Sequence, residues 1–212
     1  MPPKPSIIER IIFFGDLFLP LTIWKKIIFY LSLILSLYFV LTNSHVSAAK
    51  FALITLSLVI FTKPFVKLFP TIGLFKTLLA LRRQTGQASA LFAFSHVLAQ
   101  IFPSFNLVQL FQTSYLMGPT GYMFWGTLAL ILMFILAITS NDFSTKLLKR
   151  NWFLLQKLIH PLYIFTLIHF SIYQGRGGFL LSLIALTLLY WLRFLASQNV
   201  QLFTNLKPRQ AL

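Results

Sequence analysis

The chain has 212 residues, of which 58% are hydrophobic and 10% are charged, and its 18 Lys and Arg residues far outnumber its 3 Asp and Glu residues. Its mean hydropathy is +0.81. Soluble domains carry about 25% charged residues, so this composition excludes that class and predicts an integral membrane protein. The sequence has no cysteine, which excludes disulfides, iron–sulfur clusters, thiolate zinc sites and attached c-type haem.

Six apolar stretches approach the length of about 20 residues that a membrane-spanning helix needs. They are Ile27–Leu41, Phe51–Val66, Ala88–Ile101, Tyr122–Ile138, Trp152–Tyr173 and Phe179–Leu195. This pattern predicts an all-α, polytopic membrane protein built as a six-transmembrane-helix bundle. We expect residues 27–197 to form this domain, between a cytoplasmic interfacial segment at 1–26 and a cytoplasmic tail at 198–212.

Three further segments have the mixed composition of helices that lie along a membrane surface. Ser6–Trp24 combines apolar and charged residues, Thr71–Leu81 is framed by prolines and Arg82, and Phe102–Gly121 is polar but uncharged. They are predicted to form short interfacial helices. The tight turn at Gln174–Gly178 predicts that the last two spans are antiparallel neighbours.

Basic residues gather on one side of the six predicted spans. The side that holds both termini carries Lys4, Arg10, Lys25, Lys26, Lys63, Lys67, Lys76, Arg82, Arg83, Lys146, Lys149, Arg150, Lys157, Arg193, Lys207 and Arg209. The opposite side keeps only Lys50 and Arg176. This asymmetry predicts a multi-pass protein of the plasma membrane with both termini in the cytoplasm. Because topology and the lipid bilayer explain the charge, no nucleic-acid partner is expected.

The positions of the carboxylates argue against acid–base chemistry inside the bilayer. Glu9, Asp16 and Asp142 all fall outside the predicted spans. A proton relay or an intramembrane hydrolase would need an acidic group within the spans, where polar side chains are costly and tend to be functional. The sequence therefore argues against both.

The histidines are the remaining candidates for chemistry. His45 is interpreted as a solvated loop residue, whereas His96, His160 and His169 fall within apolar helix. His96 lies thirteen residues, about 20 Å, from the inner start of its span, and His169 lies seventeen residues, about 25 Å, from the start of its own. Both imidazoles are therefore expected in the outer half of the membrane. Such a pair suits a six-coordinate b-type haem, although a single imidazole can also bond a backbone carbonyl.

Motifs along the chain resemble the ferric-reductase-like transmembrane family. They are Thr62-x-Pro64, Arg82-Arg83-x-x-Gly86-(x)9-His96, Tyr122-x-x-x-Gly126, Leu136-Ala137-x-Thr139-Ser140, the interval from Ser140 through Lys149-Arg150 to Trp152, and Leu158, Leu162 and His169. Together they cover roughly residues 50 to 195. The ordered set is most similar to the small haem-binding MsrQ branch, which is the membrane subunit of the methionine sulfoxide reductase system.

This resemblance implies a membrane oxidoreductase or electron-transfer subunit that binds haem b, with His96 and His169 as axial ligands of the haem iron. It also implies that electrons pass from quinol or a cytosolic flavin (FMN) carrier to an extracytoplasmic acceptor, which in MsrQ is a periplasmic molybdenum enzyme. The chain has no Gly-x-Gly-x-x-Gly motif, so a flavin reductase would be a separate cytosolic partner.

The sequence departs from the family at the inner side. Gln156 stands where the family has its inner helix-5 histidine, while His160 appears one turn deeper and is a candidate ligand of a second haem. Pro161 is expected to kink the helix beside it, and Thr120-Gly121-Tyr122 replaces the family's Arg-Pro-Tyr. The sequence is compatible with one haem or with two. It is also compatible with the alternative of a non-enzymatic six-helix transporter or assembly factor that has lost haem.

Overall fold

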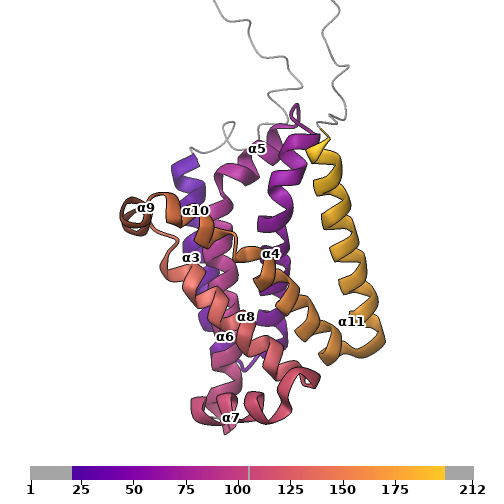
Figure 1. Cartoon of the computed structure of the whole chain (residues 1–212). Helices are drawn as coiled ribbons and strands as arrows, with labels where there is room; N and C mark the ends of the chain where they lie inside the picture. Colours follow the sequence, from indigo (N-terminus) through magenta and orange to yellow (C-terminus); the bar gives the residue numbers. More distant parts are fainter. Residues whose placement is uncertain (1–20, 105, 199–212) are drawn as a thin grey trace, which may run out of the picture.

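The computed structural model describes residues 21–104 and 106–198, and within these ranges all regular structure is helical (Figure 1). In chain order the helices are α3 (Leu21–Leu41), α4 (His45–Leu68), α5 (Gly73–Ala80), α6 (Arg82–Ser104), α7 (Leu107–Met117), η1 (Gly118–Thr120), α8 (Tyr122–Ile138), α9 (Asp142–Leu148), α10 (Arg150–Gln156) and α11 (Ile159–Ser197). The all-α prediction is confirmed. Most of the predicted interfacial segment Ser6–Trp24, and nearly all of the tail at 198–212, lie outside the described residues.

Several of the helices have the length and composition of membrane spans. Among the described residues, Leu21–Leu41, His45–Leu68 and Arg150–Ser197 are long and apolar enough to cross a bilayer. Two further pairs of helices are bent at a short break, α6 and α7 by 101° and α8 and α9 by 90°. If each bent pair is one span, the described residues contain up to five candidate spans. The protein is thus an integral membrane protein. The predicted six spans require Arg150–Ser197 to be counted as two, and that number stays a prediction.

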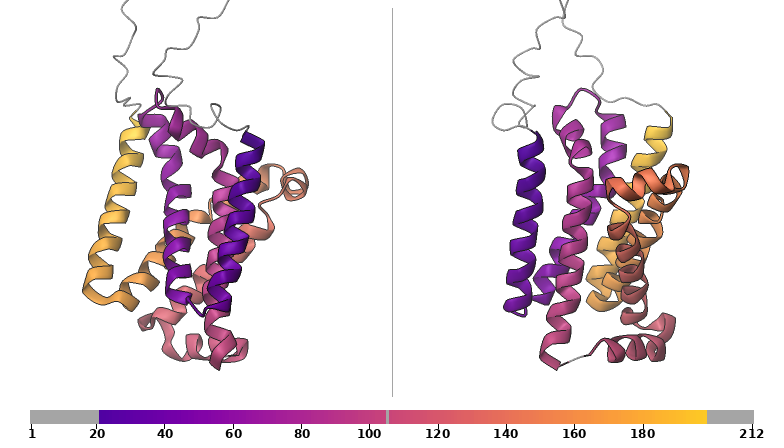
Figure 2. Two further views of the ribbon diagram at one scale, coloured as in Figure 1. Left: turned by 180° about the vertical axis from the view of Figure 1, so that it is seen from behind. Right: turned by 90° about the vertical axis from the view of Figure 1, so that its left-hand side faces the viewer.

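The chain reverses direction within α11, at Gly175, so that the helix forms two arms (Figures 1 and 2). Gly175 has φ +65°, a backbone conformation that glycine adopts without steric cost. Across the turn, the Ser182 hydroxyl donates a hydrogen bond to the Leu167 carbonyl at 3.1 Å. The predicted antiparallel packing of the last two apolar segments is therefore confirmed.

The predicted span Trp152–Tyr173 is interrupted, because α10 ends at Gln156 and α11 begins at Ile159. Pro161 explains the position of this break. A proline has no N–H to donate to the residue four positions earlier and its ring clashes with that residue's carbonyl, and here that residue is Lys157. The His160 N–H instead donates to the Lys157 carbonyl at 3.0 Å. The kink expected at Pro161 is thus found just before it.

The main hydrophobic core joins α4, α6, α8 and α11. It contains Leu56, Ile60, Ala90, Ala129, Met133, Leu136, Leu162, Tyr163, Leu167 and Leu189. Tyr163 is 1% exposed, and its hydroxyl lies 3.1 Å from the Ser57 hydroxyl on α4. Large apolar side chains also remain exposed on the outside of the bundle, among them Ile34, Phe134 and Ile184. An exterior of this kind fits a lipid environment.

Short helices form in both of the predicted segments that the described residues cover. Helix α5 lies within Thr71–Leu81, and α7 lies within Phe102–Gly121 at the end of the bundle opposite α5 (Figure 1). Asn106 caps α7, since its side chain accepts from the Gln109 N–H at 2.8 Å while the Gln109 side chain accepts from the Asn106 N–H at 3.1 Å. This reciprocal capping box explains where α7 begins.

Candidate haem site

A cavity lies among α4, α6, α8 and α11, towards the end of the bundle at which α4 and α8 begin. It encloses about 1230 Å³ of empty space, a volume that includes its open mouth. Apolar side chains such as Leu53, Leu130 and Met133 form much of its wall. Among the residues that line it are His96 and His169, so the structure brings together the two histidines that the sequence paired.

Each of these imidazoles is held by a backbone carbonyl of a neighbouring helix. The Nδ1 atom of His96 lies 2.8 Å from the carbonyl oxygen of His45, and Nδ1 of His169 lies 2.8 Å from that of Tyr122. A carbonyl can only accept, so Nδ1 carries a proton in both rings, and in a neutral imidazole Nε2 then keeps its lone pair. Metal-binding histidines are typically anchored in this way through their other nitrogen.

The two anchoring carbonyls occupy equivalent places in the fold. His45 is the first residue of α4 and Tyr122 is the first residue of α8, and both helices begin at the same end of the bundle (Figure 1). His45 therefore opens a helix and lines the cavity instead of lying in a loop as the sequence suggested. Its contribution to the site is its carbonyl, which hydropathy and spacing do not reveal.

Helix α8 approaches the ring of His169 at a glycine. A Cβ placed on Gly126 would lie 2.6 Å from Nδ1 of His169 and 2.9 Å from its Cε1, which is closer than van der Waals contact. Tyr173 lies beside the same ring, with the ring planes 8° apart and the centroids separated by 6.5 Å. The orientation of the His169 ring is thus set by its hydrogen bond to the Tyr122 carbonyl, by the close approach of α8 at Gly126 and by the ring of Tyr173.

The donor set fits a haem better than a metal ion held by protein alone. Within the described part of the chain, no three His, Cys, Asp or Glu side chains come together in a group that could hold a metal ion. A haem needs only two protein ligands, because its porphyrin supplies the other four nitrogens. The two imidazoles, from α6 and α11, line one largely apolar cavity and are therefore two candidate ligands.

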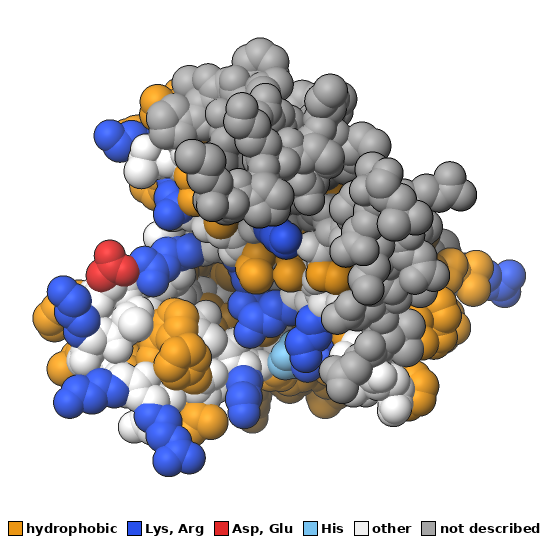
Figure 3. Space-filling model, turned by 90° about the horizontal axis from the view of Figure 1, so that it is seen from above, with side chains coloured by type: hydrophobic (Ala, Val, Ile, Leu, Met, Phe, Trp, Pro, Cys, Tyr) orange, Lys and Arg blue, Asp and Glu red, His pale blue; other side chains and the backbone are white. Residues whose placement is uncertain are grey.

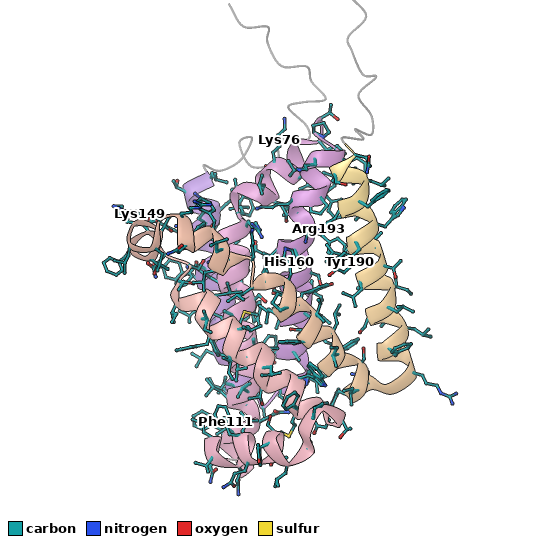
Figure 4. All side chains as sticks on the ribbon, in the orientation of Figure 1. Lys76, Phe111, Lys149, His160, Tyr190 and Arg193 are labelled. Atoms are coloured by element: carbon teal, nitrogen blue, oxygen red, sulfur yellow. The ribbon has the colours of Figure 1, made fainter. Side chains whose placement is uncertain are left out.

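His160 is not among the residues that line this cavity. Figure 4 shows it facing Arg193 on the second arm of α11, and Nη1 of Arg193 lies 3.0 Å from Nδ1 and 2.9 Å from Nε2 of the imidazole. Gln156, on the preceding helix, has a buried Nε2 atom with no hydrogen-bond partner among the described residues. The role of His160 as a ligand of a second haem stays a prediction.

A model of the family described as "ferric reductase like transmembrane component" matches residues 46–167, a segment that runs from the start of α4 into α11 and includes His96. No curated protein and no solved structure gives a significant match. The family match spans more than half of the chain, and the chain therefore belongs to the ferric reductase like transmembrane component family, whose transmembrane domain indicates electron transfer in a membrane.

Proposed function

We propose that the protein is a haem b-binding electron-transfer protein of the plasma membrane, with His96 and His169 as the axial ligands of one haem. The observation that carries this proposal is the matched anchoring of the two imidazoles, each of which bonds a carbonyl through Nδ1 at 2.8 Å. Both residues line one apolar cavity. The proposal retains the six-span domain at residues 27–197, with both termini in the cytoplasm.

The chain's own residues would bind, orient and shield the cofactor. The carbonyls of His45 and Tyr122 fix both imidazoles with Nε2 free to ligate, and this anchoring raises the basicity of the ligating nitrogens. The apolar wall excludes water and lowers the local dielectric, which tunes the redox potential. When bound, the haem supplies a one-electron redox centre.

We further propose that the electrons come from quinol and leave to an extracytoplasmic partner protein, as in the MsrQ branch that the sequence resembles. Gln156 in place of a histidine supports a single haem, at the end of the bundle far from the cytoplasm. A cytosolic flavin reductase would then sit too far from that haem to reduce it. Quinol arrives laterally through the lipid and avoids that distance. Reduction of the protein in proteoliposomes by a separate flavin reductase, without any reduction by quinol, would reverse this assignment.

The test of haem binding is an absorption spectrum of the purified protein, together with the ratio of haem to protein. We expect a Soret band that responds to reductant, a ratio near one, and loss of the band in His96→Ala and in His169→Ala. His45→Ala is the matched control, because it removes a cavity-lining ring but keeps the backbone carbonyl that bonds His96. This variant should retain the haem.

A second candidate is a non-enzymatic membrane protein, such as a transporter or assembly factor, that keeps the fold and has lost haem. The observation that favours it is Gln156, whose buried amide replaces a ligand of the family. A monodisperse wild-type protein that stays colourless after incubation with haemin would establish this alternative and refute the redox proposal.

A further inference from the structure

Four basic side chains converge at the end of the bundle opposite the cavity. They are Lys63 on α4, Arg82 on α6, and His160 and Arg193 on the two arms of α11; we call them the basic cluster. The His160 imidazole is close enough to the other three side chains to interact with their charges. Lys63 likewise interacts electrostatically with Arg82 and Arg193. Figure 3 shows a histidine side chain lying against Lys and Arg side chains beside a hollow on this face.

Among residues 21–104 and 106–198, no carboxylate neutralises the basic cluster. Asp142 is the one acidic side chain in those ranges, and it forms an ion pair with Arg83. Arg82 donates through Nε to the Val59 carbonyl at 3.2 Å, so the two terminal nitrogens of its guanidinium are left for another acceptor. Like charges that are partly removed from water repel one another, and a bound anion would relieve that repulsion.

The surroundings of Arg193 indicate which anion fits. Tyr190 and Phe194 lie within about 100° of Arg193 around α11 and are 55% and 59% exposed, so an apolar and aromatic surface adjoins the charges. Tyr and Trp are enriched where membrane helices meet lipid headgroups. Basic pockets between transmembrane helices bind anionic headgroups, and the adjoining apolar surface would pack against the acyl chains.

We propose that the basic cluster is a binding site for the phosphate of an anionic phospholipid. Arg82 and Lys63 contact the phosphate oxygens, and Arg193 is held in place by its contact with His160. In this arrangement His160 positions a cation for the lipid and does not ligate a second haem. The proposal is independent of haem binding at His96 and His169.

Native mass spectrometry of the full-length protein tests this proposal. The protein is titrated with phosphatidylglycerol or with phosphatidylcholine of the same chains, and we expect the former to bind more tightly. Arg82→Gln and Arg193→Gln should each weaken phosphatidylglycerol binding about fivefold, which is the effect of one cation at a membrane surface. Lys76→Gln is the matched control, because Lys76 is an exposed cation at the same end of the bundle (Figure 4), and this variant should bind as the wild type does.

Two further measurements separate the alternatives. Arg193→Lys keeps the charge and should bind more lipid than Arg193→Gln, and each variant should keep the elution volume of the wild type. Equal binding of the two lipids, or equal loss in the Lys76→Gln control, would overturn the proposal. Displacement of phosphatidylglycerol by inorganic phosphate would overturn the lipid assignment in favour of a free phosphate. Since the readout is lipid mass, it stands whether or not the protein contains haem.

Discussion

Replacing Gly126 with alanine should weaken haem binding without unfolding the protein. The added Cβ would lie 2.6 Å from Nδ1 of His169, which is about 0.8 Å short of the 3.4 Å at which ordinary contacts begin. The atoms it meets belong to a side chain and not to backbone, so the imidazole moves while the helices stay in place. Moving the ring away from α8 stretches the 2.8 Å bond to the Tyr122 carbonyl beyond hydrogen-bonding distance.

The expected magnitude follows from the role of that carbonyl. Loss of such an anchoring contact typically lowers metal affinity about 10–100-fold, and we expect a loss in this range for haem. The assay is a titration of haem-free protein with haemin, followed at the Soret band. Gly86→Ala is the matched control, because Gly86 is also helical and a Cβ there meets nothing within 4 Å. Wild-type affinity in Gly126→Ala would refute the argument that α8 positions His169.

Two further predictions concern stability. The hydrogen bond and charge of Arg83 hold the pKa of the Asp142 carboxyl below its usual range, so the pair stabilises the fold above the ordinary pKa of about 4 and its contribution fades as the pH falls through the lowered folded-state pKa. Thermal melts of wild type and Asp142→Asn should therefore differ slightly at pH 6 and converge in acid; a gap that widens in acid would contradict this sign. Gly175→Ala forces a side chain into a turn with φ +65° and ψ −142° and should destabilise the protein by about 1–3 kcal/mol in denaturant titrations. Gly177→Ala, where the added Cβ meets nothing within 4 Å, should cost less. Equal losses would show that the turn is not strained by a side chain.

The sequence predicted the helical class and most helix positions well, because hydropathy and helix length are properties of contiguous residues. Helix α8 begins and ends at Tyr122 and Ile138, the same residues as the apolar stretch read from the sequence. Helix α3 extends further than its apolar core, since it begins at Leu21 and includes two lysines whose charged ends can reach the membrane surface. The break before Ile159 was foreseeable from Pro161, because a proline cannot continue the hydrogen-bond pattern of the helix before it.

Composition, hydropathy and residue spacing were enough to predict a basic, cysteine-free, helical membrane protein with two histidines at similar depth on separate spans. The packing of the helices decided how those histidines are held, because the carbonyls of His45 and Tyr122 lie 51 and 47 residues away from the rings they anchor. It also decided that Arg193 meets His160 across 33 residues. The periodicity of apolar residues indicates which face of a helix a residue occupies. A hydrogen bond to another helix depends instead on how the helices pack, and that packing is set by the whole bundle at once.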